Sequence, residues 1–182
     1  QTLYVSGGNG VDANTAVSNA NLMTIGLSDV SAFVGYDGVG LSLTEVNLAI
    51  ALWSEVGGSQ RKWRSVMASG NASFAGVAGL TLTATNVGIE INQQATDNTV
   101  VDYRQGTGES HATALAVVTG PGETVTFALD DLSGDFMQVT GTATIDLFGF
   151  TTVTGGFGLE KQSGQTLYVS GGNGVDANTA VS

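Results

Sequence analysis

Apolar and polar residues alternate along most of this chain, with the period of two that is expected of β-strands. An extended segment is predicted over Leu22–Gly35, and the chain then turns at Tyr36-Asp37-Gly38. No segment keeps a helical period for more than about three turns. The pattern therefore predicts an all-β fold built from long antiparallel hairpins. The strands that it predicts most clearly are Val39–Trp53, Arg61–Gly76, Gly79–Asn92, Phe136–Leu147 and Phe150–Glu160.

Two of these predicted strands share a break in their alternation. The segments GLSLTEVNLAIAL (Gly40–Leu52) and GLTLTATNVGIEI (Gly79–Ile91) align with each other, and in both the apolar residues change from one parity to the other midway. Because a strand has a period of two, the change near Thr44–Glu45 predicts a β-bulge or a bend. Thr140–Gly155 is a third, weaker copy of the same hairpin sequence.

The remaining segments are less regular. Thr2–Val5 predicts a strand that ends in a glycine-rich turn, and residues 11–21 predict a loop in which Asp12–Ala16 could form a short helical turn. Residues 93–111 are polar and irregular. Ala112–Val118 could be a strand or a helical turn, and Thr124–Leu129 alternates as a strand.

The chain contains an internal repeat. Gln1–Ser18 reads QTLYVSGGNGVDANTAVS, and Gln165–Ser182 reads the same, so the offset is 165 − 1 = 164 residues. A fixed offset of this kind indicates a tandem array. We therefore interpret residues 1–164 as one complete repeat unit and residues 165–182 as the start of the next.

The repeat also predicts how neighbouring units are joined. If Gln165–Ser170 folds back on Phe150–Glu160, the first strand of each unit completes the sheet of the unit before it. Main-chain hydrogen bonds then connect the units, and the first strand of an isolated unit leaves an open sheet edge. The predicted inter-repeat contact residues are Thr2, Leu3, Tyr4, Val5, Thr166, Leu167, Tyr168 and Val169.

Composition supports a β-rich, acidic repeat. The chain has 27 glycines, one proline and no cysteine, and its formal charge is −11. A net negative charge keeps an apolar-rich array soluble and disfavours nucleic acid as a partner. The absence of cysteine excludes disulfides and thiolate metal sites. No apolar stretch reaches the roughly 18 residues that a membrane-spanning helix needs.

Two acidic loops are candidate calcium sites. Asp130, Asp131 and Asp135 place three carboxylates in one turn, and calcium prefers several oxygen ligands. Gly7–Asp12 matches the first part of the calcium-binding pattern GGxGxDxUx, but Asn14 stands where a large apolar residue is required. Turn-forming glycines, and a solvated acidic turn at Asp130–Asp135, are the simpler interpretations.

A second candidate site is basic and aromatic. Arg61, Lys62, Trp63 and Arg64 hold three of the five basic residues and could bind a neighbouring acidic unit or a glycan. The alternative is a strand whose positive charges discourage aggregation. For catalysis, Ser110 is next to His111, the only histidine, so a serine triad is excluded and no enzyme is predicted.

The perfect repeat, the GLSLTEVNL and GLTLTATNV hairpins, and the acidic composition resemble the tandem repeats of giant bacterial surface proteins and adhesins. The resemblance implies an extracellular stalk or fibre at the cell surface, often steadied by calcium. We therefore predict a structural repeat of an extracellular filament that assembles with neighbouring copies of itself. The alternative is a calcium- or glycan-binding adhesive module.

Overall fold

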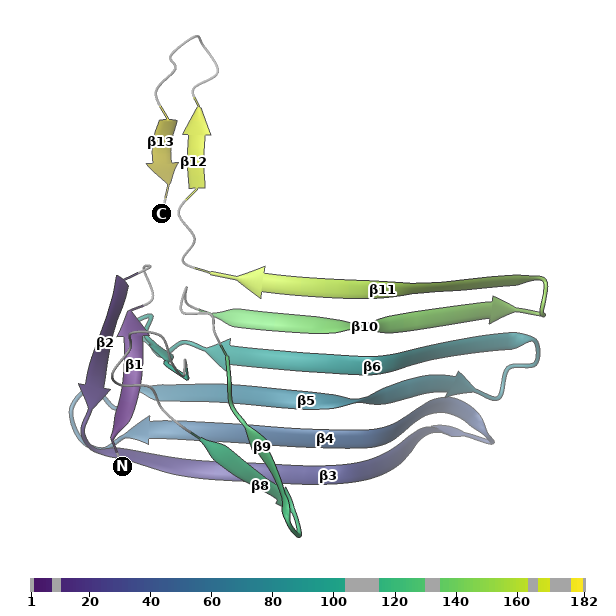
Figure 1. Ribbon diagram of the computed structural model, residues 1–182, viewed down its shortest axis with the longest axis horizontal. Coiled ribbons are helices and arrows are strands. Elements are labelled where there is room, and N and C mark those ends of the chain that lie inside the picture. Colours follow the sequence, from purple (N-terminus) through teal and green to yellow (C-terminus); the bar gives the residue numbers. More distant parts are fainter. Residues whose placement is uncertain are drawn as a thin grey trace.

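The computed structural model describes residues 2–7, 11–103, 115–129, 135–163, 167–170 and 178–181, in which every regular element is a β-strand. Its main component is one six-stranded antiparallel sheet in the order β11-β10-β6-β5-β4-β3 (Figure 1). The predicted all-β fold of long antiparallel hairpins is confirmed. The six strands are β3 (Ala20–Tyr36), β4 (Val39–Glu55), β5 (Lys62–Ala75), β6 (Leu80–Gln93), β10 (Phe136–Leu147) and β11 (Thr151–Gln162).

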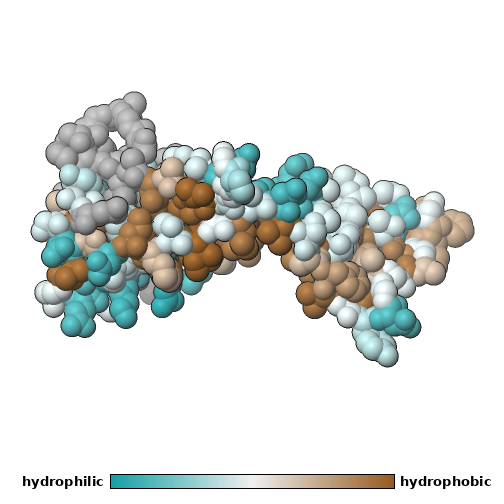
Figure 2. Space-filling view, turned by 90° about the horizontal axis from the view of Figure 1, so that it is seen from below, coloured by the Kyte–Doolittle hydropathy of each residue, from teal (hydrophilic) through white to brown (hydrophobic). Residues whose placement is uncertain are grey.

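The predicted change of alternation is also confirmed, because bulges interrupt the sheet near the middle of its strands. The register between β4 and β5 shifts between Thr44 and Asn47, and Glu45 there has a φ of 53°. Strand β6 has a bulge at the same level, where Asn86 has a φ of 51°. A third bulge, at Asp29 in β3, was not predicted. Bulges bend a sheet, and the edge-on view in Figure 2 shows the molecule bent near its middle.

A row of polar contacts joins these bulges across four strands. The Asp29 N–H donates to Asn47 Oδ1 at 3.2 Å. Asn71 Nδ2 donates to Glu45 Oε2 at 2.6 Å, and Asn71 Oδ1 accepts from the Asn86 N–H at 3.0 Å. Side chains therefore bond main-chain groups that the bulges leave without a ladder partner.

Smaller strands cover one face of the sheet at the end where β3 begins. Strands β1 (Leu3–Gly7), β2 (Val11–Val17) and β7 (Val100–Val101) form a three-stranded sheet in the order β2-β1-β7. Strands β8 (Ala116–Gly120) and β9 (Glu123–Thr126) form a hairpin that crosses β3 (Figure 1).

The prediction of a loop over residues 11–21 is wrong. Residues 11–17 form β2, and Ala20 already begins β3. The small polar side chains of this segment show no apolar alternation, but its backbone pairs with β1 from Leu3↔Val17 to Gly7↔Val11. Main-chain pairing with β1 therefore holds this segment as a strand. The ambiguous segment Ala112–Val118 yields strand β8, which begins at Ala116.

The hydrophobic core lies between the sheet and this cover. The sheet contributes Ala49, Ala51 and the two tryptophans, Trp53 and Trp63, all of which are buried. We call the side of the sheet that carries them the covered face. The cover contributes Leu3, Val5, Val17, Val101, Tyr103, Val117, Phe127 and Leu129.

The repeated sequence forms the same hairpin twice. Strands β12 (Leu167–Ser170) and β13 (Asn178–Val181) pair with Leu167 opposite Val181, which reproduces Leu3 opposite Val17 at an offset of 164. The predicted pairing of Gln165–Ser170 with Phe150–Glu160 is not formed in the described residues, where β12 pairs only with β13 and β11 pairs only with β10. The eighteen repeated residues contain both strands of a hairpin, so each copy forms its hairpin from its own residues.

Candidate interaction surfaces

The face of the sheet opposite the covered face is apolar along its whole length. Residues directly opposite each other on neighbouring antiparallel strands point to the same side. The pairing registers place one apolar residue from each strand in rows across the sheet. Two complete rows are Leu27, Leu48, Ala68, Ile89, Val139 and Leu159, and Val34, Leu41, Phe74, Leu82, Ile145 and Val153. We call this side the open face.

No strand in the described part of the chain packs over the open face. The buried sheet residues, among them Ala49, Trp53 and Trp63, all point to the covered face. On the open face, in contrast, Val34 is 68% exposed and Leu82 is 40% exposed. A large, contiguous apolar patch on a protein surface is typical of an interaction site, so the open face is a candidate for one.

The open face is hollowed at the bend. A depression of about 160 Å³ is lined by Leu43 and Val46 on one side and by Val87 and Ile89 on the other. Small residues, including Gly70, form its floor, because β5 carries no large side chain at this level. The hollow is almost entirely apolar, so an aliphatic or aromatic side chain is the group that would fill it.

Away from the cover, the opposite side of the sheet has a different chemistry. Thr144 and Thr154 bond each other there at 3.0 Å, and Thr152 donates to Asp146 at 2.6 Å. The hydrogen bond from Thr152, helped by the Gly149 N–H, lowers the pKa of Asp146. A hydroxyl-rich side is readily solvated, whereas the open face leaves apolar side chains exposed to water.

The two outer strands of the sheet present free edges. In the described residues, β3 pairs only with β4 and β11 pairs only with β10. An unpaired edge strand offers a row of N–H and C=O groups to another chain. Figure 1 shows that the β8–β9 hairpin extends past the outer edge of β3. Val118 in this hairpin is 69% exposed.

Glycines mark the place where β8 passes over β3. A Cβ atom on Gly26 would overlap the carbonyl group of Val118, so only glycine admits the crossing strand. Strand β11, at the other edge of the sheet, also carries glycines on its covered-face side. A Cβ on Gly158 would meet no atom within 4 Å, and one on Gly156 would meet only the Gly141 carbonyl oxygen, at 3.8 Å. Contacts within the unit therefore do not explain these two glycines.

The predicted basic and aromatic patch does not form one surface. Trp63 is 1% exposed, and its Nε1 donates to the carbonyl oxygen and to Oγ1 of Thr99, both at 3.1 Å. Lys62 and Arg64 alternate with Trp63 along β5 and therefore lie on the opposite side, at one end of the open face. A tryptophan platform for a glycan is absent at this position.

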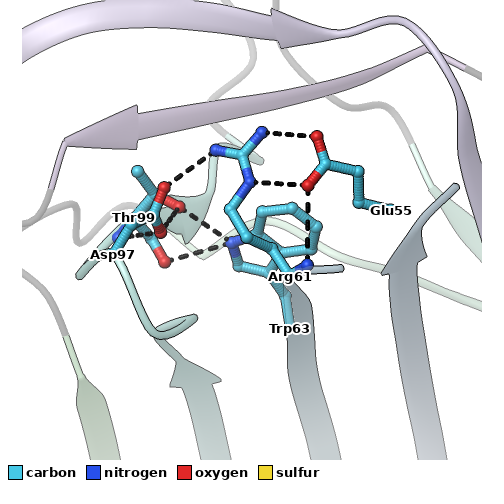
Figure 3. Close-up of polar contacts among 5 residues, drawn as sticks. All are labelled: Glu55, Arg61, Trp63, Asp97 and Thr99. Carbon is cyan, nitrogen blue, oxygen red and sulfur yellow. Dashed lines mark hydrogen bonds and ion pairs between the residues drawn. The ribbon is translucent and has the colours of Figure 1, made fainter. Parts of the chain in front are cut away.

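Arg61 instead stabilises the loop ends around Trp63 (Figure 3). Its guanidinium binds both carboxylate oxygens of Glu55, at 3.0 and 2.9 Å, and Asp97 Oδ2 at 2.8 Å. It also lies 5.2 Å from the centre of the Trp63 ring, a cation–π distance. This cluster connects the β4–β5 turn with the turn that precedes β7.

The carboxylates of the Arg61 cluster are held in their charged form. The hydrogen bond from Arg61 lowers the pKa of Glu55. Burial acts to raise the pKa of Asp97, but hydrogen bonds from Thr99 and Arg61 outweigh it and lower the value. The bond to Glu55 is the main reason that the pKa of Arg61 is raised.

A buried polar chain crosses the core beneath the cover. Trp53 Nε1 donates to Tyr103 Oη at 3.2 Å, and Tyr103 Oη donates to Ser65 Oγ at 2.9 Å. Ser65 Oγ in turn donates to Asn92 Oδ1, and Asn92 Nδ2 donates to the Val101 carbonyl at 2.8 Å. Burial raises the pKa of Tyr103 to about 12, so its hydroxyl stays protonated and keeps both bonds. This series of hydrogen bonds attaches the cover to the sheet.

The structure tests little of the calcium prediction. Asp130 and Asp131 lie outside the described residues, and so do Gly8, Asn9 and Gly10 of the second pattern, in which Asp12 is described as strand backbone only. Asp135 is described, and its Oδ1 accepts from the Gln94 N–H at 2.7 Å. The described residues contain no group of three or more metal-binding side chains.

The predicted inter-repeat residues of the first copy belong mainly to their own unit. Leu3 and Val5 are fully buried in the core, whereas Thr2 is exposed and Tyr4 is partly buried. Thr166 lies outside the described residues, and Leu167, Tyr168 and Val169 are described as strand backbone only. Their role in joining units stays a prediction.

No family model, no curated protein and no solved structure matches this chain. In the part that the structure describes, no helix is long and apolar enough to cross a membrane.

Proposed function

We propose that this chain is a structural repeat of an extracellular fibre or surface stalk, in which one continuous β-sheet passes from each unit to the next. The observation that carries the proposal is the repeated hairpin. It occurs before β3 and again after β11 with the same register, and the first copy leads directly into β3.

The strand count supports a continuous sheet. Six antiparallel strands separate the outer edge of β3 from the outer edge of β11, so these two strands run in opposite directions. A β3 from the next unit, placed beside β11, would therefore be antiparallel to it. Antiparallel neighbours with short connections are the common arrangement.

The connection between units also supports it. Strand β11 ends at Gln162, at the end of the sheet where β3 begins. The hairpin β12–β13 follows, and in the first unit β3 begins three residues after β2 ends. The next β3 would thus start beside the end of β11. We therefore place the contact between units at the edges of β11 and β3, and not at the repeated strand.

The unexplained glycines of β11 fit the same arrangement. The β8–β9 hairpin overhangs β3, and in the array this overhang would lie above β11 of the preceding unit (Figure 1). Gly156 and Gly158 would leave room there for a crossing strand, as Gly26 does within the unit. The formal charge of −11 would keep such an array soluble. The extracellular location follows from the resemblance to bacterial surface repeats.

The proposal is tested with a chain of two complete units that ends in the repeated hairpin. Valine at Gly158 of the first unit should obstruct the overhanging hairpin and lower the melting temperature of the two-unit chain. The same substitution in the second unit, whose β11 precedes no complete unit, is the matched control and should change little. In the 182-residue chain G158V should also be tolerated, because the new side chain meets open space.

Amide hydrogen exchange gives a direct reading of the joint. In the two-unit chain, amides of the first β11 that point away from β10 should exchange at least ~10-fold more slowly than in the second β11. Equal exchange in both copies, with G158V neutral at both positions, would overturn the proposed joint.

A further inference from the structure

We propose that the open face binds the open face of a second copy, so that two sheets pack face to face as a sandwich. The interface is isologous, which means that each copy contributes the same rows of residues. This inference rests on the single unit and holds whether or not successive units share a sheet.

The size of the face favours an extended partner. Six strands spaced ~4.8 Å apart, each with about 12 residues at ~3.3 Å per residue, give a face of roughly 1,200 Å². A stable interface needs about 800 Å² from each partner. A short peptide would leave most of the rows exposed, whereas a second sheet covers them together.

The described strands of this chain do not supply the cover. The strands that pack on the sheet all lie on the covered face. The longest stretch outside the described residues, 104–114, reads RQGTGESHATA, and residues 130–134 read DDLSG. These sixteen residues include one large apolar side chain, Leu132, which is far too little to cover six strands.

The chemistry of the face matches a copy of itself. The rows carry aliphatic and aromatic side chains without an acidic residue, so two such faces meet without repulsion even though each chain has a charge of −11. The cations Lys62, Arg64 and Lys161 stand at one end of the face, outside the apolar rows. Side chains of the facing sheet can enter the hollow beside Gly70.

The face also fits a property of tandem units. When six-stranded units continue edge to edge, their open faces lie on the same side and form one apolar band. A ribbon with one apolar side reaches a stable state by pairing with another ribbon, as in sheet sandwiches with a shared core. Pairing would thus double the thickness of a fibre without a new type of contact.

The test uses sedimentation of the 182-residue chain over a range of concentrations. We expect a monomer–dimer equilibrium. Leu82 and its neighbour Thr81 lie on the central strand β6 with side chains on opposite sides, so they form a matched pair. Leu82→Lys places a charge in the interface twice and should raise the dissociation constant about 100-fold or more. Thr81→Lys should leave it unchanged.

A second variant guards against a folding defect. Val34→Lys changes a side chain that is 68% exposed, at the far end of β3 and on the same face, and should also give monomers. Circular dichroism confirms that both variants keep their strand content. Neither substitution alters the main-chain edges of β3 and β11. If Leu82→Lys still forms open-ended polymers, the chains associate through these strand edges and not through the open face, and the inference is overturned.

Two further results would also overturn it. One is a wild-type chain that stays monomeric at concentrations of hundreds of micromolar. The other is a monomeric chain that floats with zwitterionic lipid vesicles and loses this binding in Leu82→Lys, because the occupant would then be a lipid surface rather than a second copy.

Discussion

At the scale of single residues, this protein stabilises its turns and its cover with a few buried polar contacts. Arg61 joins two turns through Glu55 and Asp97, and Tyr103 joins the cover to the sheet. The sequence predicts a ligand or partner patch at Arg61, Lys62, Trp63 and Arg64. The alternation along β5 could have indicated that Trp63 and its two cationic neighbours point to opposite sides.

Arg61→Gln should remove part of the acid sensitivity of the fold. The pKa values of Glu55 and Asp97 lie below their ordinary values of 4.5 and 3.8, so their contribution to stability is complete above those values. It is lost as the pH falls through the lowered values of the folded state. The wild-type melting temperature should therefore fall more steeply below pH 4.5 than that of the variant. Parallel curves would contradict the assignment, and Arg64→Gln is the control.

Tyr103→Phe should lower the free energy of unfolding by about 1–3 kcal/mol, because it leaves the Trp53 Nε1 and Ser65 Oγ groups without the hydroxyl. Chemical denaturation measures the change. Tyr36→Phe, at a position that is 88% exposed, should change stability little. Equal effects of the two substitutions would show that the buried hydrogen bonds of Tyr103 do not contribute to the free energy of unfolding.

At the scale of elements, the bulges and glycines decide how strands cross and bend. The repeated change of parity in two sequences correctly predicted the bulges in β4 and β6, because alternation records which side each residue faces. The bulge at Asp29 carries no such signal, since Leu27, Ser28 and Asp29 do not alternate clearly. Strand β2 was missed for the same reason, and with it the hairpin that the repeat forms.

Asn86 tests the bulge in β6. Its φ of 51° lies in the left-handed region, which a β-branched residue strongly disfavours. Asn86→Val should destabilise the protein by about 1–2 kcal/mol, whereas Asn86→Gly should be tolerated. Thermal melts of the two variants measure the difference, and an equally stable valine variant would exclude a strained bulge at this site.

Gly26 tests the crossing of β8 over β3. Alanine there would press on the carbonyl of Val118 and should cost about 1–3 kcal/mol, because the backbone must shift. Gly158→Ala adds the same methyl group to another strand of the sheet, where the unit leaves open space. In the 182-residue chain it should be neutral in the same unfolding measurement. Similar losses at both positions would contradict the crossing geometry.

At the scale of the whole molecule, a bent sheet has one covered end, one apolar open face and two free edges. The sequence predicted the strands and the repeat, but it could not predict which face the cover occupies. That choice depends on contacts between β1, β7, β8 and the sheet, which are distant in sequence. The open face was therefore identifiable only from the registers of all six strands.

The axial length of arrays with two, three and four units tests the proposed continuous sheet most directly. X-ray scattering in solution, at concentrations where the arrays do not associate, gives this length. Six strands per unit at ~4.8 Å predict an increase of roughly 29 Å for each added unit. Joining at the strand ends would instead add at least the length of β4, whose 17 residues span roughly 56 Å. An increase of that size, or lengths typical of flexibly linked separate units, would contradict the continuous sheet.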